Sequence, residues 1–409
     1  MVRVVIRILA GMAAFAPPAL WAEKTPPPPE PKPAVRIEVA PLGYYPPGAF
    51  YLTYQLSSAA LGFFDNQHLL FTFRVGGLLR RIPGDPSTDD DQQIRAVVLD
   101  LASGKVTQQT EWRMHDRLQY LWPLTQARFL VRRRNTLFLT GPSLELEPWM
   151  TFDAAIQHIQ ISPDRRLLIV ETEEAEPAAA PEAQRLGAGR PVAVTILDIA
   201  DRMPIASLKG QAPSLLPITG DGLLDVLEGK APGYWAMRDI PFHGAPKIVG
   251  QIKSGCQPWV RPLSATAVFV EGCYLDGEDH AISVLAMDGR ELWHDRWENR
   301  YVWGWFDTAE NGSRFAYESV EVGRPISSFD ALYPEDVQGQ MVGVYDTESG
   351  RMVLVRDASP VLTAGQNVAL SPDGTRFAVL RNGAIEVYDL PPLTAPQPAG
   401  GEVAAKKKK

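Results

Sequence analysis

The chain repeats one short pattern seven times: an apolar residue followed by Ser, Thr or Asp, a tight turn, and a β-rich run. The copies begin at Phe64, Leu124, Ile161, Ile218, Leu263, Phe306 and Leu370. They are separated by 60, 37, 57, 45, 43 and 64 residues. The short intervals match one four-stranded blade of a β-propeller, and the long ones leave room for insertions. We therefore predict an all-β fold, a single seven-bladed β-propeller with four-stranded antiparallel blades.

A second pattern follows the third β-rich run of most copies, where an acidic residue stands at the end of the run. These residues are Asp100, Asp198, Asp288 and Asp346. Asp bonds to turn backbone and Gly adopts left-handed conformations, so the pattern predicts a hairpin between the third and fourth strands. The copy at Ile218 lacks this aspartate, and six or eight blades therefore remain open alternatives.

Composition limits the class of partner. The 409 residues carry a net charge of −8, and a surface that grips nucleic acid needs a basic face. A hydrophobic content of 45% is enough for one large closed β domain. We expect a monomer that binds no nucleic acid.

The N-terminus has the features of an export signal: Arg3 and Arg7, an apolar run to Ala16, and a processing site at Leu20-Trp21-Ala22. The run is too short to span a bilayer comfortably, so no transmembrane segment is expected after cleavage. We predict a signal peptide at 1–22, a Pro-rich linker at 23–48, the propeller at 49–393 and a flexible Lys-ended tail at 394–409. The predicted location is the periplasm or the medium.

Ring closure requires a strand from outside the last copy, because that copy supplies only three strands before Pro391. The segment Ala49 to Ser58 has strong β propensity and no blade of its own. We expect this N-terminal strand to join the last blade and remove the exposed sheet edges.

The two "SPD" turns, the "D-x-x-S-G-K/R" hairpins and the blade spacing resemble secreted bacterial propellers of the YVTN, WD-repeat-like and Tol-translocation classes. The resemblance covers residues 50 to 390, and its motifs specify blades rather than an activity. It implies a binding or scaffold module for a protein, peptide or carbohydrate ligand. A minority of such propellers are enzymes.

Two cysteines, Cys256 and Cys273, flank the hairpin at Leu263. If Leu263 pairs with Thr266, the same antiparallel register places the two cysteines opposite each other. We predict a disulfide, which an exported protein can keep oxidised. Two free thiols are the alternative.

The segments that lead into the first strands carry aromatic, amide and basic side chains near one mouth of the expected channel. The candidate ligand-binding residues are Tyr120, Trp122, His158, Gln257, Trp259, Arg261, Tyr301, Trp303, Trp305 and Asn367. Flat apolar rings beside directional hydrogen-bonding groups suit a carbohydrate or peptide. Ordinary packing of aromatic residues between blades is the alternative.

Three insertions, at about 78–95, 172–190 and 320–340, fall between second and third strands and are mostly acidic. We expect their carboxylates, Asp91 and Asp336 among them, to be solvated; a cation site or a basic partner is the alternative.

Searches for catalytic motifs find no nucleophile elbow, phosphate-binding loop, H-E-x-x-H pair or C-x-x-C. The six histidines are scattered without metal-ligand spacing, and the run Tyr274 to His280 is typical of a hairpin turn. We assign no catalytic residue, metal or cofactor. The alternative function is a metal-dependent, lactonase-like hydrolase that uses the central channel.

Overall fold

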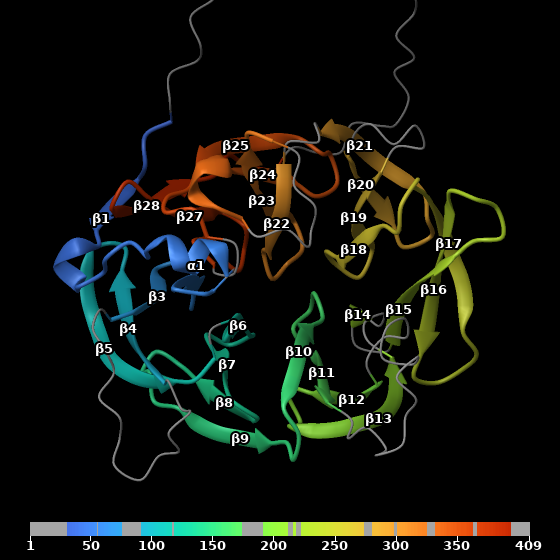
Figure 1. Ribbon diagram of the computed structural model, residues 1–409, viewed down its shortest axis with the longest axis horizontal. Coiled ribbons are helices and arrows are strands. Elements are labelled where there is room, and N and C mark those ends of the chain that lie inside the picture. The colour runs from blue at the N-terminus through green and yellow to red at the C-terminus, as the bar shows by residue number, and fades with distance from the viewer. Residues whose placement is uncertain are drawn as a thin grey trace, which may run out of the picture. The chain divides into compact units, whose positions relative to one another are not determined.

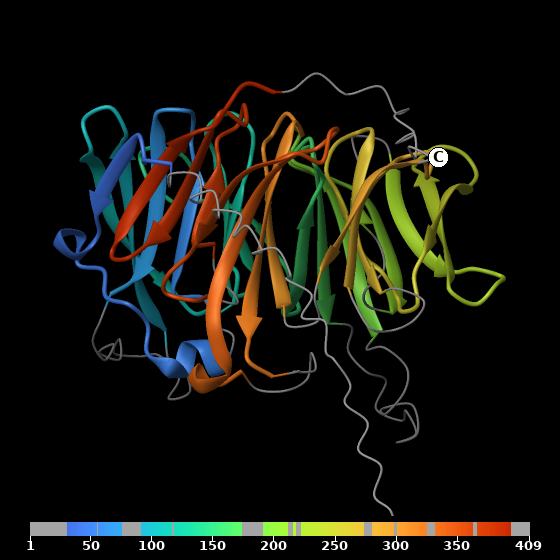
Figure 2. The same ribbon diagram turned by 90° about the horizontal axis from the view of Figure 1, so that it is seen from above.

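The computed structural model forms a β-propeller of seven four-stranded antiparallel sheets, built from 28 strands in the part of the chain that it describes. Figure 1 shows the sheets as blades arranged in a ring. Figure 2 shows the ring from its edge, with the strands running between its two faces. The described residues are 31–54, 56–75, 91–116, 118–173, 191–211, 216–217, 222–273, 280–297, 301–324, 332–362 and 366–393. Pro33–Lys409 form one compact unit. The predicted fold and blade count are confirmed.

Blades 1 to 4 each use four consecutive strands, ordered from the hub outward. Their strands are β2 (Ala59–Phe63), β3 (His68–Arg74), β4 (Gln92–Asp100) and β5 (Lys105–Met114); β6 (Leu121–Pro123), β7 (Phe129–Arg133), β8 (Thr136–Thr140) and β9 (Glu147–Thr151); β10 (Ile156–Ile161), β11 (Leu167–Glu173), β12 (Pro191–Asp198) and β13 (Met203–Gln211); β14 (Leu216–Pro217), β15 (Gly222–Glu228), β16 (Tyr234–Pro241) and β17 (Lys247–Lys253). The copy at Ile218, which lacks the third-strand aspartate, thus forms a complete blade.

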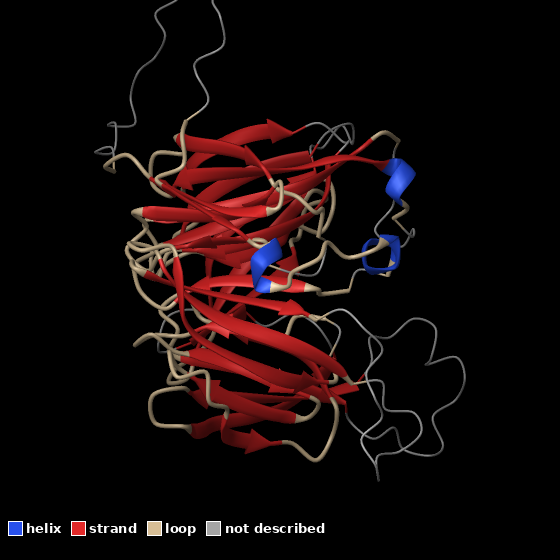
Figure 3. Cartoon of the chain, turned by 90° about the vertical axis from the view of Figure 1, so that its left-hand side faces the viewer, coloured by secondary structure: helices blue, strands red, loops and turns tan. Residues whose placement is uncertain are grey.

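Blades 5 and 6 follow the same order, and blade 7 takes its outer strand from the N-terminal part of the chain. Their strands are β18 (Trp259–Pro262), β19 (Ala267–Cys273), β20 (His280–Ala286) and β21 (Glu291–Trp297); β22 (Tyr301–Thr308), β23 (Arg314–Val322), β24 (Val337–Asp346) and β25 (Met352–Asp357); β26 (Val368–Leu370), β27 (Arg376–Arg381), β28 (Ala384–Asp389) and β1 (Val35–Glu38). The helical segments are η1 (Ala40–Leu42), α1 (Ala49–Thr53) and η3 (Pro334–Asp336), and Figure 3 shows how small they are beside the strands.

Closure by an N-terminal strand is confirmed, but the strand is not the one expected from the sequence. β1 pairs with β28, with Val35 opposite Val387 and Glu38 opposite Ala384, inside the range 23–48 predicted as linker. Residues 49–53 of the segment Ala49 to Ser58 form α1 instead, and Leu52 packs beside Val320 and Val322. The assignment of Ala49 to Ser58 as the closing strand is therefore wrong.

The distance between the outer and inner strands of a blade explains why Ala49 to Ser58 cannot be the closing strand. The outer strand of a blade lies three strand spacings, roughly 14 Å, from the inner strand. A closing strand at Ala49 to Ser58 would leave no connection to β2, which begins at Ala59. When β1 is the closing strand, residues 39–58 connect the rim of blade 7 to the hub strand β2. Helix α1 is part of this connection.

The turns between third and fourth strands behave as the sequence predicts. Asp100 Oδ1 accepts a hydrogen bond from the Ser103 backbone N–H at 2.6 Å, and Gly104 follows with a φ of 68°. Gly289 and Gly350 also have positive φ values, of 84° and 67°. These hairpins let the third and fourth strands of blades 1, 5 and 6 pair without a long loop.

The acidic insertions lie between second and third strands, at β3–β4, β11–β12 and β23–β24. Most of their carboxylates, like the tail at 394–409 and the signal at 1–22, lie outside the described residues. Asp91 and Asp336 are described, and both are largely buried. Arg113 Nε donates to Asp91 Oδ2 at 2.5 Å, and Arg324 Nε donates to Asp336 Oδ1 at 2.6 Å. The expectation of solvated carboxylates is wrong for these two residues, which basic groups of their own blades neutralise.

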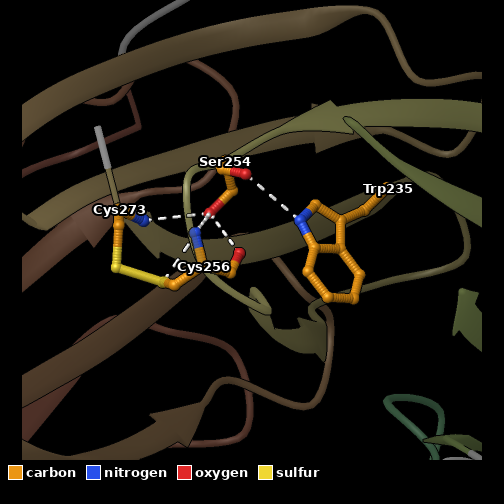
Figure 4. Close-up of a disulfide and its surroundings, with 4 residues drawn as sticks. All are labelled: Trp235, Ser254, Cys256 and Cys273. Atoms are coloured by element: carbon orange, nitrogen blue, oxygen red, sulfur yellow. Dashed lines mark hydrogen bonds between the residues drawn. A yellow bond between two sulfur atoms is a disulfide. The ribbon is translucent and has the colours of Figure 1, made fainter. Parts of the chain in front are cut away.

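Blade 5 contains the disulfide between Cys256 and Cys273, whose Cα atoms are 5.4 Å apart (Figure 4). The predicted register is wrong by one residue, because Trp259 faces Glu271 and the Leu263 N–H bonds to the Ala267 carbonyl at 2.9 Å. Ser264 is the reason. Its Oγ accepts hydrogen bonds from the backbone N–H groups of Thr266 and Ala267, both at 3.1 Å, and so lengthens the turn.

The disulfide forms despite this shift because the chain before β18 leaves the regular ladder at Ser254. Ser254 Oγ donates to the Cys256 carbonyl at 2.6 Å and accepts from the Cys273 N–H at 3.0 Å. The Ser254 carbonyl accepts from Trp235 Nε1 at 3.2 Å, which attaches this turn to blade 4 (Figure 4). The buried Ser254 side chain therefore brings the two cysteines together.

Replacing Ile37 tests the closing strand. Ile37 is 7% exposed and packs in the core cluster of blades 1 and 7, so Ile37→Ala should lower the free energy of unfolding by about 2–3 kcal/mol. Glu38→Ala, on the exposed face of the same strand, should stay within about 0.5 kcal/mol of the wild type. Urea unfolding measures both. Equal effects of the two substitutions would show that β1 does not close the ring.

Replacing both cysteines tests the disulfide. Closing a loop with a sequence separation of 17 contributes roughly 3 kcal/mol in the chain-entropy model, so Cys256→Ser with Cys273→Ser should lose about that much stability. Dithiothreitol should destabilise the wild type similarly and leave the double variant unchanged. A wild-type melting curve that does not respond to the reductant would contradict the bond.

Candidate functional site

The first strands of the blades surround a pocket at the hub of the propeller, with a volume of about 160 Å³. Figure 1 shows β6, β10, β18 and β22 nearest the centre of the ring. Five of the predicted ligand-binding residues line this pocket: Trp122 from β6, His158 from β10, Trp259 and Arg261 from β18, and Trp305 from β22. Four blades thus bring together side chains that are up to 183 positions apart in the sequence.

Three predicted residues have other surroundings. Tyr120 is buried between blades 1 and 2, where its hydroxyl lies 2.7 Å from Thr72 Oγ1. Asn367 is fully buried, and its amide donates to Gln340 Oε1 at 2.8 Å and to the Pro360 carbonyl at 3.1 Å. Gln257 is exposed and is not among the pocket-lining residues. The side chains of Tyr301 and Trp303 lie outside the described part of the molecule.

Several lining residues were not singled out in the sequence, among them Gln160, Arg165, Asp307 and Gln366. Gln160 follows His158 by two positions in β10, and strand alternation alone would have placed both side chains on one face. In the sequence, Asp307 is only the acidic residue that follows Phe306 at the start of its copy, a position that indicates a turn. Its Oδ2 accepts a hydrogen bond from the Leu370 N–H at 2.7 Å and so links blades 6 and 7.

Arg165 had no sequence signal, because its partners come from other blades. It lies in the turn after β10 with a φ of 56°, and its guanidinium crosses the hub from blade 3 to blade 6. Nη1 donates to Glu310 Oε2 at 3.2 Å and to the Leu124 carbonyl at 3.3 Å. Nη2 donates to the Thr308 carbonyl at 3.3 Å. These contacts form the wall of the pocket on the side where the turns between the first and second strands lie.

The charges of the pocket follow from its burial. Burial lowers the pKa of Arg261 to about 10, so its guanidinium stays protonated at neutral pH. Desolvation of the ring in the pocket, together with the charges of Arg261 and Arg132, lowers the pKa of His158 to about 4 although part of the residue is exposed to solvent, so this imidazole is neutral. Burial raises the pKa of Asp307 to about 6, against the opposing effects of the Leu370 N–H and Arg165.

The chemistry of the site is that of a binding pocket. A cavity of roughly 150 Å³ accepts a benzene-sized group, so a pocket of about 160 Å³ takes one side chain or one ring of a ligand. Indole rings offer flat apolar area, and Arg261, His158 and Gln160 offer directional polar contacts.

Among the described residues, no three His, Cys, Asp or Glu side chains are grouped so as to hold a metal ion. The loop from Tyr274 to Asp279 lies outside those residues, and the metal-dependent hydrolase stays a prediction. In the same described part, no helix is long and apolar enough to cross a membrane.

No protein-family model matches the chain, and no curated protein matches it. Among solved structures, uncomplexed acylaminoacyl peptidase from Pyrococcus horikoshii is 10% identical with a TM-score of 0.49, and the match covers 83% of this chain and 52% of that one. A chain of a mitotic checkpoint complex is 11% identical with a TM-score of 0.45, covering 95% and 98%. The chain thus spans about half the length of the peptidase. At these identities and TM-scores the similarities carry no information about activity.

The His158 titration tests the electrostatics of the pocket. In an NMR pH titration, His158 should show a pKa near 4 rather than its ordinary 6.5. Arg261→Gln removes a positive charge and should raise the His158 pKa, whereas Lys247→Gln, on an outer strand of blade 4, should leave it unchanged. The unfolded chain takes up this proton at higher pH than the folded one, so this group reduces stability as pH falls from about 6.5 to 4. An ordinary His158 pKa would contradict this description of the pocket.

Proposed function

We propose that this chain is an exported propeller that acts as a binding module for a peptide or carbohydrate ligand, which it holds in the hub pocket. The observation that carries the proposal is the convergence of Trp122, Trp259 and Trp305 with Arg261 and His158 from four blades. Other aromatic side chains pack between blades, for example Phe269 against Phe315 with ring centroids 5.6 Å apart. Trp122 and Trp259 also contribute to the core, and all three indoles of the pocket border a cavity.

Polar groups without partners support the same proposal. Trp305 Nε1 and Arg261 Nε are buried and have no hydrogen-bond partner among the described residues. A buried donor without a partner costs about 1–3 kcal/mol, and a bound ligand that accepts these bonds would remove that cost. Both donors belong to side chains that line the pocket.

The disulfide supports export. Disulfides persist in oxidising compartments and are rare in the cytosol, and the bond between Cys256 and Cys273 lies beside the hub strand β18. The periplasm or the medium is thus the compartment in which we propose that this site operates.

Ligand screening by NMR tests the binding function. The indole N–H signals of Trp122, Trp259 and Trp305 should shift when N-acetylated amino acids, dipeptides or monosaccharides are added, because these rings line the pocket. Trp259→Ala should weaken binding of a responding compound by up to about tenfold. Trp149→Ala, on the outer strand β9 of blade 2, is the matched control and should bind normally.

The proposal fails if no compound class shifts the three hub signals. It also fails if Trp149→Ala weakens binding as much as Trp259→Ala does.

A further inference from the structure

Arg261 is the one cation of the pocket that lacks an acidic partner within the described part of the chain. Its guanidinium carbon lies 4.8 Å from the centre of the Trp259 ring, a cation–π contact, and the residue forms no ion pair with a described carboxylate. Its Nε is buried without a hydrogen-bond partner. A charge removed from water is costly unless it is paired, and stacking on an indole replaces only part of its hydration.

The other charged groups that line the pocket have partners, and one further carboxyl lies beside it. Arg165 bonds to Glu310 and to two backbone carbonyls, and Asp307 accepts from the Leu370 N–H and lies near Arg165. Glu171 is opposite His158 in the β10–β11 pairing, and burial raises its pKa. His158 itself forms no hydrogen bond or ion pair with a described residue. The lining of the pocket therefore presents one guanidinium that has no described acidic partner, next to one uncharged imidazole.

We propose that the ligand enters this pocket through a carboxylate, which pairs with Arg261 and accepts a further hydrogen bond from His158. This inference rests on the proposed binding function and names the chemical group that the pocket selects. The planar guanidinium matches a carboxylate in a two-bond geometry, and such charge-assisted bonds are about twice as strong as neutral ones. The rings of Trp122 and Trp259 contact the uncharged body of the ligand.

A single carboxylate fits the pocket better than a phosphate dianion does. One cation is unpaired, and the second basic group, His158, is neutral at physiological pH. A phosphate would add a second negative charge that no free cation balances. The same carboxylate chemistry occurs at the C-terminus of a peptide and in a uronic acid, and the experiment separates these two sources.

Matched acid and neutral probes test the proposal on the full-length protein. The pairs are N-acetylglycine with N-acetylglycinamide, and galacturonic acid with galactose, with binding followed by tryptophan fluorescence and by the hub indole NMR signals. We expect the acid of at least one pair to bind at least about tenfold more tightly than its neutral partner. Preference within the first pair alone identifies a peptide C-terminus, preference within the second alone a sugar acid, and either supports the proposal.

Variants tie the preference to Arg261. Arg261→Gln should abolish the acid preference, and Arg261→Lys should reduce it, because lysine keeps the charge but loses the planar pair of donors. Arg202→Gln, which removes a cation from the rim of blade 3, is the matched control and should leave it unchanged. In the wild type the bound acid, but not its neutral partner, should raise the His158 pKa, since a nearby anion opposes the effect of Arg261. This readout needs no variant, so it decides the question even if Arg261→Gln does not fold.

Two results would overturn the inference. Equal binding of acid and neutral partner at the hub would reject the carboxylate and leave the proposed binding function standing. If neither member of either pair shifts the hub signals, and the wider panel of compounds is also silent, both proposals are wrong.

Discussion

The antiparallel pairing of β1 with β28 is the interaction on which the rest of the structure depends. A ring of sheets has two free edges until the first and last segments of the chain meet, and here Val35–Glu38 cover the outer edge of blade 7. Closure brings blade 7 against blade 1, where Ala60 bridges to Gln366. The first strands then surround one hub. Without this contact the pocket has no fixed wall, because its lining residues belong to separate blades.

The hub is stabilised by polar contacts as well as by the ring. Arg165 joins blade 3 to blade 6 across the centre, and Asp307 joins blade 6 to the backbone of blade 7. At the blade 6–7 contact, Arg314 is 2% exposed and donates to Asp346 Oδ1 at 2.7 Å and to the Gly374 carbonyl at 2.8 Å. These groups are paired and buried, and they contrast with Arg261, whose guanidinium stacks on an indole and has no acidic partner among the described residues. That contrast separates the residues that hold the ring from the residue that remains available for a ligand.

Much of the site could be predicted because aromatic residues at the starts of the first strands are a local pattern. Trp122, Trp259 and Trp305 precede the starts of their copies, at Leu124, Leu263 and Phe306, by no more than four positions, so locating the copies located the rings. Tyr120 and Asn367 occupy similar places but face the interior between blades, where Thr72 and Gln340 take up their polar groups. Local sequence does not distinguish these two outcomes. The difference depends on which neighbouring blade the side chain meets.

The amino-acid sequence alone determined the blade unit and the hairpin turns, because both follow from strand alternation and turn chemistry within short segments. It favoured seven blades, and it indicated the cysteine pair, although the structure joins the two cysteines through the turn at Ser254. Tertiary structure alone decided that Val35–Glu38 rather than Ala49 to Ser58 closes the ring, since that choice depends on the distance from rim to hub. It also decided that Arg165 meets Glu310 across 145 positions of sequence and that Arg261 forms no ion pair with an acid of the described residues. Contacts at such separations carry no local signal, because their partners become neighbours only when the ring is closed.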